Sequence, residues 1–137
     1  MFNQVFRTNR HSCFSLKYHL VVVTKYRHKI IDDAIFERLS DIAKNIFETK
    51  NKCNIISMNY EADHIHILLD AVPQVCLSIL INSFKTVSSR LIRKEFANKV
   101  AKYYWKPIFW SGSYFISSVG DTDVETVKTY IASQSKN

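Results

Sequence analysis

An α+β sandwich is the fold class that this sequence predicts, on three observations. Stretches rich in β-branched residues alternate with stretches whose apolar residues recur every three or four positions, the periodicities of strands and helices. These stretches follow one another without a glycine-serine linker, a low-complexity segment or an internal repeat. The length, 137 residues, is that of one ordinary domain. We therefore expect residues 1–137 to form a single domain.

The first strand and the first helix are predicted within residues 14–50. Residues 14–24 are mostly apolar and rich in β-branched side chains, as in a buried strand. Asp32 or Asp33 is placed to cap a helix that ends near residue 50. The inner face of this helix carries apolar residues at helical spacing: Ile35, Leu39, Ile42 and Ile46. The chain therefore begins with a strand followed by an amphipathic helix.

A pair of strands follows, over residues 53–60 and 64–71, with a tight turn at 61–63 between them. The second strand contains His64 and His66, which are two positions apart. Because side chains alternate along a strand, both imidazoles should point to one face and the isoleucines to the other. The pattern predicts half of a metal site at the edge of a core.

The second half of the chain predicts a helix, a strand and a terminal helix. Residues 76–96 form an amphipathic helix, and its inward residues are Leu77, Ile81, Phe84, Val87 and Leu91. Its more exposed side carries Lys85, Ser89, Arg90, Arg93 and Lys94. Residues 113–119, between the two glycines, predict a fourth strand. The segment 122–125, Thr-Asp-Val-Glu, matches a capping box that starts the last helix.

This order of elements is that of a ferredoxin-like or RRM-like α/β sandwich, with the terminal helix added. In such a fold the first and third strands are central neighbours in an antiparallel sheet, and two helices cover one face. His19 on the first strand is then expected near His64 and His66. The histidines are expected on the other face, exposed to a ligand or a partner chain.

The terminal helix carries Tyr130 and Gln134 one turn apart on one side. Taken alone, His64 and His66 are more simply surface or structural histidines, and Tyr130 a packing residue whose hydroxyl reaches water. A structural zinc site would also need four protein ligands, whereas two imidazoles leave coordination positions open. The combination of an open site, a phenol and an amide indicates covalent chemistry on phosphate.

Charge and aromatic residues together indicate a nucleic-acid partner. The 19 Lys and Arg residues against 12 Asp and Glu give a net charge of +7, which favours a polyanionic partner. Basic and aromatic residues alternate over 25–29 and 99–106, where rings could stack on unpaired bases and lysines neutralise phosphates. There are simpler alternatives. The net charge could only make a basic surface soluble, the basic side of the helix at 76–96 could be a solvated face, and part of the aromatic set could belong to the core. The candidate DNA contacts are Lys25, Arg27, Lys85, Arg90, Arg93, Lys94, Tyr104 and Trp105.

Several functional classes are excluded by composition. Cys13, Cys53 and Cys76 form no C-x-x-C pair, so we expect reduced, mostly buried thiols rather than disulfides or a cysteine zinc site. Two glycines cannot make a Walker loop or a dinucleotide fingerprint, so no nucleotide cofactor is expected. The first ten residues lack the apolar stretch of a signal peptide, and no apolar run approaches the roughly 18 residues of a membrane span. The expectation is a soluble cytoplasmic protein without a membrane partner.

Four segments in this order resemble the single-tyrosine HUH transposases of small bacterial and archaeal insertion sequences: 18–27, 63–66, 113–120 and 130–134. The resemblance runs over nearly the whole chain. It implies that Tyr130 is the nucleophile, that His64 and His66 are metal ligands, and that Gln134 is the third protein ligand. It also implies magnesium or manganese. Because hard cations prefer oxygen ligands, this donor set should bind magnesium weakly and manganese better.

The resemblance further implies the reaction and the partners. Single-stranded DNA at insertion-sequence ends would be cleaved and rejoined through a 5′-phosphotyrosine intermediate, with recognition of subterminal hairpins. The protein would be a homodimer with two composite sites, each taking histidines from one subunit and Tyr130 from the other. The acceptor of the phenol proton is left open, although Glu61 and Asp63 are near in sequence.

Three other classes fit parts of the sequence. A non-catalytic RNA-recognition domain shares the element order, but its third strand would carry a basic-aromatic stacking motif. A two-histidine phosphoesterase would need a second H-x-[ST] element, which His11, His19 and His28 do not supply. A domesticated or non-catalytic relative could keep the same residues and bind nucleic acid without mobilising an element. An activity assay separates this last class from the enzyme.

Overall fold

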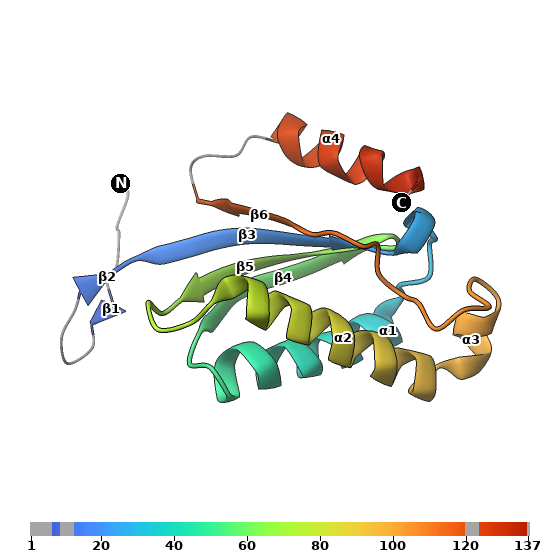
Figure 1. Ribbon diagram of the computed structural model, residues 1–137, viewed down its shortest axis with the longest axis horizontal. Helices are drawn as coiled ribbons and strands as arrows, with labels where there is room; N and C mark the ends of the chain where they lie inside the picture. The colour runs from blue at the N-terminus through green and yellow to red at the C-terminus, as the bar shows by residue number, and fades with distance from the viewer. Residues whose placement is uncertain (1–6, 9–12, 120–123, 137) are drawn as a thin grey trace.

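The computed structural model describes residues 7–8, 13–119 and 124–136, and a four-stranded antiparallel sheet forms its centre (Figure 1). The strand order is β4-β5-β3-β6. These strands are β3 (Leu16–Val23), β4 (Asn54–Glu61), β5 (His64–Ala71) and β6 (Phe115–Ser118). The first and third strands predicted from the sequence, β3 and β5, are central neighbours. That prediction is confirmed.

Helices lie on both sides of the sheet. Figure 1 shows α1 and α2 side by side on one face and α4 on the opposite face. The helices and helical turns are η1 (Lys25–Arg27), α1 (Asp33–Ala43), the π-helical η2 (Lys44–Thr49), α2 (Leu77–Glu95), α3 (Ala97–Ala101), α4 (Val124–Ser133) and η3 (Gln134–Lys136). The α+β sandwich with an added terminal helix is therefore confirmed. The short α3 was not predicted from the sequence.

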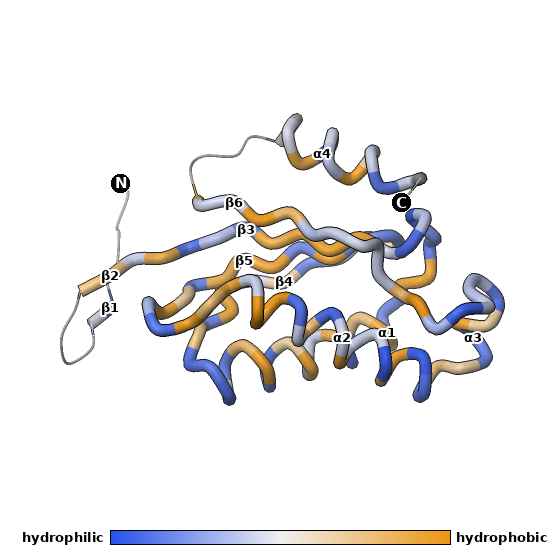
Figure 2. The backbone as a smooth tube through the Cα atoms, viewed as in Figure 1, coloured by the Kyte–Doolittle hydropathy of each residue, from blue (hydrophilic) through white to orange (hydrophobic). Residues whose placement is uncertain are grey.

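The core lies between the sheet and the first two helices. The hydropathy of the chain alternates along α1 and α2, as expected for helices with one buried face (Figure 2). All four inward residues predicted for the first helix are buried: Ile35, Leu39, Ile42 and Ile46. The buried face of α2 is rotated from the prediction and centres on Leu80, Ile81, Phe84, Ser88 and Ile92. Ser88 belongs to it because its hydroxyl accepts a hydrogen bond from Trp110 Nε1 (2.9 Å).

Some local predictions need correction. Cys13 and Cys76 are exposed, so Cys53 is the one buried thiol of the three. The fourth strand is shorter than the predicted 113–119, because the ladder of β6 with β3 is confined to Phe115–Ser118. The capping box at 122–125 begins outside the described residues.

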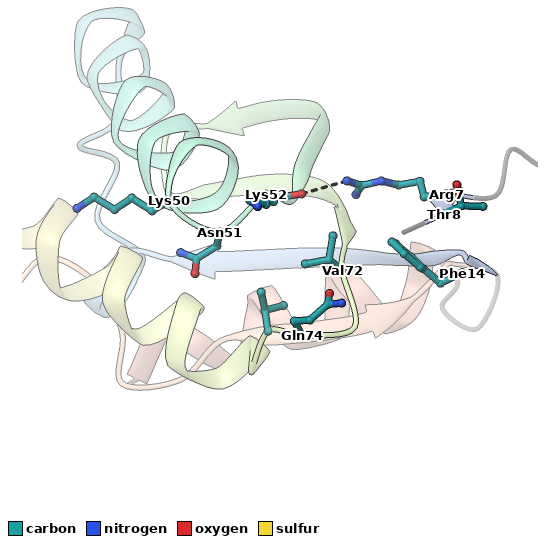
Figure 3. Close-up of a pocket in the computed structure, with 9 residues that line it drawn as sticks. Arg7, Thr8, Phe14, Lys50, Asn51, Lys52, Val72 and Gln74 are labelled. Atoms are coloured by element: carbon teal, nitrogen blue, oxygen red, sulfur yellow. Dashed lines mark hydrogen bonds between the residues drawn. The ribbon is translucent and has the colours of Figure 1, made fainter. Parts of the chain in front are cut away.

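A cavity of about 560 Å³ lies at one end of the sheet, beside the short strands β1 (Arg7–Thr8) and β2 (Cys13–Phe14) (Figure 3). The sequence did not predict this strand pair. Arg7 donates hydrogen bonds to the carbonyl oxygens of Lys52 (3.0 Å) and Asp70 (3.1 Å). Asp70 and His64 lie at opposite ends of β5. This cavity is therefore remote from the histidines.

The start of α1 depends on Asp32, whose Oδ1 accepts a hydrogen bond from the Ile35 N–H at 2.9 Å. Asp32→Ala leaves that donor without its cap, and we expect the free energy of unfolding to fall by about 1 kcal/mol. The measurement is the urea midpoint at unchanged m-value. Asp41→Ala, an exposed position on the same helix, is the control, with an expected change within about 0.5 kcal/mol. Equal losses in both variants would contradict the capping role.

Candidate active site

Strand β5 turns His64 and His66 away from α1 and α2, and the isoleucines between and after them are buried in the core. Val23 and Val21 of β3 pair directly with these two histidines and share their face. Both valines are fully buried, yet neither belongs to the main core. Helix α4 lies over this face (Figure 1). The histidine face is thus partly covered, contrary to the open face that the sequence predicted.

Asp63 orients the first histidine. Its side chain is buried, with Oδ1 2.8 Å from His64 Nδ1 and Oδ2 accepting a hydrogen bond from Arg27 Nε at 3.0 Å. A carboxylate that accepts the Nδ1–H leaves the lone pair on His64 Nε2, the form in which imidazole binds a cation. Burial alone would raise the pKa of Asp63, but the hydrogen bonds and charges of His64 and Arg27 lower it overall. Both oxygens are engaged, so Asp63 is poorly placed to take a proton from a phenol.

The side chain of His66 contacts that of His19 on β3. His19 Nδ1 lies 3.0 Å from His66 Nε2, and the two rings stack with centroids 5.1 Å apart. The predicted closeness of His19 to His66 is confirmed. Burial lowers the pKa of His66, and the neighbouring His19 and His64 lower it further. The His66 ring is therefore neutral near pH 7 and keeps a lone pair.

Tyr130 and Gln134 meet at one serine. The Tyr130 hydroxyl lies 2.9 Å from Ser113 Oγ, and the same Oγ donates to Gln134 Oε1 at 3.2 Å. The Tyr130 ring packs on Phe115 of β6 with centroids 5.4 Å apart. This confirms that the phenol and the amide lie on one side of the terminal helix. Ser113 was not among the site residues predicted from the sequence, since nothing but its place beside Gly112 distinguishes it.

Burial sets the protonation state of the phenol. It raises the pKa of Tyr130, while the neighbouring hydroxyls of Ser113 and Ser111 offset part of the rise. A phenol whose pKa lies above its usual value near 10 is protonated at neutral pH. Tyr130 therefore needs a nearby positive charge or a base before it can act as a nucleophile.

Sheet register brings the two halves of the site together. Ser111 N–H donates to the Val23 carbonyl at 2.8 Å, and Val23 pairs with His64 on its other side. Segment η3, which begins at Gln134, contacts η1, the segment that contains Arg27. The histidines, the phenol and the amide of one chain thus lie on one face, at one end of the sheet.

The donors present suit a divalent cation with open coordination positions. In the described part of the chain, no three His, Cys, Asp or Glu side chains converge to hold a metal ion. A centre here would therefore combine the imidazoles of His64 and His66 with the amide oxygen of Gln134. Neutral imidazoles suit first-row transition metals, and amide oxygens suit magnesium and manganese. The donor types at these three positions fit such an ion.

The predicted DNA contacts fall into two groups. Arg90, Lys94 and Trp105 are exposed, and Lys25 and Arg93 are partly exposed, so these five remain candidates. Tyr104 is only 5 % exposed and donates a hydrogen bond to the Lys25 carbonyl (2.6 Å), so it is not an open stacking surface. Arg27 is engaged with Asp63.

Lys85 has a structural position instead of an exposed one. Its Nζ donates to the carbonyl oxygens of Ser111 (2.8 Å) and Ser113 (3.0 Å). Burial lowers the pKa of Lys85, and the charge of Lys25 lowers it further. Lys85 is half-buried, so it is less exposed than the sequence predicted. Lys85 holds the segment on which Tyr130 and Gln134 rest.

Known proteins place this chain in a family. The sequence model of a family described as IS200-like transposases matches residues 12–134. The chain belongs to the IS200-like transposases. It is 31 % identical to the ISDra2 transposase TnpA of Deinococcus radiodurans over 121 residues, 88 % of this chain and 85 % of that protein. It is 29 % identical to the IS200 transposase of Salmonella typhimurium over 124 residues, 90 % and 80 % of the two chains.

Solved structures agree with this family. A crystal structure assigned as a transposase from D. radiodurans R1 matches with a TM-score of 0.82 at 27 % identity, over 93 % of this chain and 97 % of the other. A REP-associated tyrosine transposase bound to a REP hairpin matches with a TM-score of 0.56 at 8 % identity, over 91 % and 68 %, and shares the fold alone. The resemblance inferred from the sequence is confirmed. Within the described residues, no helix has the length and apolar character to cross a membrane.

The position of Lys85 gives a testable prediction for this transposase. Lys85→Met removes two charge-assisted hydrogen bonds to residues 111 and 113, and we expect it to lower the free energy of unfolding by about 2 kcal/mol. A lysine that contacted phosphate would instead change the salt dependence of DNA binding by about one counterion. Urea unfolding and the salt dependence of binding to a single-stranded oligonucleotide separate the two roles.

Arg90→Met is the matched control, because Arg90 is an exposed cation on the same helix. Its unfolding free energy is expected to change by less than about 0.5 kcal/mol. Unchanged stability together with a reduced salt slope in Lys85→Met would contradict the structural role.

Proposed function

We propose that this transposase cleaves and rejoins single-stranded DNA at insertion-sequence ends through a 5′-phosphotyrosine intermediate on Tyr130. One observation carries the proposal: the Tyr130 hydroxyl and the Gln134 amide share Ser113, at the end of the sheet where Asp63 orients His64. The proposed nucleophile and the proposed ligands of a cation thus lie at one end of the sheet. The family membership supports a reaction on DNA.

The proposed roles follow from the surroundings of each residue. Asp63 fixes the tautomer of His64, so that its Nε2 presents a lone pair, and burial keeps the His66 ring neutral beside His19. With Gln134, they would hold Mg²⁺ or Mn²⁺, which would supply positive charge to favour the phenolate and to stabilise charge on the phosphate. Ser113 directs the Tyr130 hydroxyl.

The reaction balances without a nucleotide cofactor. The Tyr130 oxygen attacks phosphorus, the bond from phosphorus to the 3′-oxygen breaks, and the phenolic proton is lost as the 3′-oxygen gains one. The products are a 5′-phosphotyrosine and a free 3′-hydroxyl. Attack by another 3′-hydroxyl on the phosphotyrosine forms a new phosphodiester and returns the phenol.

The proposed substrate is single-stranded DNA with subterminal hairpins, bound by a homodimer with composite sites. A hairpin is bound in the solved REP-associated transposase, which shares this fold. The net charge of +7 suits a polyanion. In the single chain described here, α4 covers the sheet of its own subunit, and a swap of α4 between two copies would build the same site from two chains.

Covalent attachment tests the nucleophile. With Mn²⁺ and a cognate single-stranded end, the wild-type protein should form an adduct that survives denaturation, and Tyr130→Phe should reduce it to background. Tyr114→Phe, which removes a hydroxyl from a partly buried tyrosine beside β6, is the control and should keep the adduct. Denaturing electrophoresis of labelled DNA is the measurement. Attachment that persists in Tyr130→Phe would assign the nucleophile elsewhere.

Mixed dimers test the composite site. His64→Ala/His66→Ala protein mixed equally with Tyr130→Phe protein should recover about a quarter of wild-type cleavage, because about half of the dimers are then mixed and each has one complete site. If each site is built within one chain, every site stays incomplete. Inactivity in mixed dimers confirmed by differential tags would overturn the shared site and leave the chemistry intact.

A further inference from the structure

Seven residues line an aromatic pocket of about 190 Å³: Tyr26, His28, Tyr103, Tyr104, Trp105, Lys106 and Ile108. The His28 ring contacts three of the other rings. The His28 ring stacks on Tyr104 with centroids 5.0 Å apart and lies 5.7 Å from Tyr26 and 5.8 Å from Tyr103. The walls of the pocket are therefore largely faces and edges of planar rings.

The aromatic pocket adjoins the candidate active site through η1. Tyr26 and His28 line the pocket, while Arg27 between them contacts Asp63, the residue that orients His64. Tyr26 and Arg27 have φ values of 60° and 56°, in the left-handed region. Such non-glycine residues cost about 1–3 kcal/mol each and cluster at functional sites. The strained turn directs neighbouring side chains to the two sites.

Lysines accompany the exposed rings of the pocket. Lys25 Nζ lies 5.3 Å from the centre of the Tyr26 ring, and Lys106 Nζ lies 4.9 Å from the Trp105 ring. Trp105 is 88 % exposed, an unusual state for so large an apolar side chain. Rings for stacking beside cations for phosphate are the two features by which proteins bind single strands.

Size limits the occupant. Sites for drug-sized ligands measure about 300–1,000 Å³, so a pocket of 190 Å³ suits one planar ring system and not a base pair. A paired base is also stacked on both faces and cannot enter. Because ring stacking is tolerant of base identity, the pocket would select an unpaired base at a position rather than a particular base.

We propose that the aromatic pocket binds one unpaired nucleobase of the DNA strand that carries the scissile phosphate, a fixed number of nucleotides from that phosphate. The proposal rests on the proposed cleavage site, whose Asp63 contacts the same turn. Base capture there would hold the strand in one register while Tyr130 attacks. Trp105 stacks on the base, and Lys106 and Lys25 face the adjoining phosphates.

Fluorescence of Trp105 tests base binding without any cleavage. The chain has two tryptophans, and Trp110 is buried while Trp105 is exposed. In a Tyr130→Phe background without added metal, titration with a cognate single-stranded end should quench the emission. The quench should vanish in Trp105→Phe/Tyr130→Phe, which retains Trp110 alone. A quench of equal size in that double variant would overturn the proposal.

Affinity measurements give the size of the effect. Trp105→Ala should weaken binding of the single strand by about 5- to 150-fold, the range for removal of one base-stacking ring. Ile79→Ala, which truncates an exposed apolar side chain of α2 outside the pocket, is the matched control and should leave affinity unchanged. Unchanged affinity in Trp105→Ala would overturn the proposal.

An abasic scan locates the base. Single strands that each lack one base should show one position of large affinity loss in the wild type, and that loss should disappear in Trp105→Ala. Equal losses of affinity at all positions would overturn the proposal that the pocket binds one base. A Tyr130-independent adduct together with a position-specific loss would overturn the cleavage proposal alone. A Tyr130 adduct without such a position would overturn the pocket alone.

Discussion

The antiparallel pairing of β3 with β5 is the constraint on which the site depends. Val21 pairs with His66 and Val23 with His64, so the histidines face away from the core while Ile65 and Ile67 fill it. A slip of one residue would exchange these two sets and bury both imidazoles among apolar side chains. The same Val23 also accepts the hydrogen bond from Ser111 that begins the segment beneath Tyr130. One strand therefore positions both halves of the site.

Periodicity in the sequence correctly predicted which face of a strand or helix a side chain occupies. It failed to predict how deeply a side chain is buried and which residues far away in the sequence it contacts. The alternation around His64 and the spacing of Tyr130 and Gln134 each fixed a face correctly. Helical period placed Lys85 near the edge of an apolar stripe, but only the folded chain brings carbonyls of residues 111 and 113 within its reach. Tyr104 and Trp105 are neighbours of one chemical kind, yet one is 5 % and the other 88 % exposed. No sequence pattern distinguishes them.

Net charge likewise overstates the charge available to DNA. Of the cations near the site, Arg27 neutralises the buried Asp63, and Lys85 satisfies backbone carbonyls. Removing either would leave buried polar groups unpaired, which costs more than a surface charge contributes. Some basic residues of this protein thus stabilise the site, and others are available to bind DNA phosphates. The count of 19 Lys and Arg in the sequence cannot separate them.

The hydrogen bonds of Ser113 connect the proposed nucleophile, Tyr130, with the proposed cation ligand, Gln134. Its hydroxyl contacts the Tyr130 phenol and donates to the Gln134 oxygen, the atom proposed to bind a cation. Burial raises the pKa of Tyr130, so the phenol stays protonated in this arrangement. Under the proposed chemistry, a cation bound to the Gln134 oxygen would lie beside the phenol that Ser113 contacts, and its charge would favour the phenolate. Cation binding and activation of the nucleophile would then be linked through Ser113, which contacts both groups.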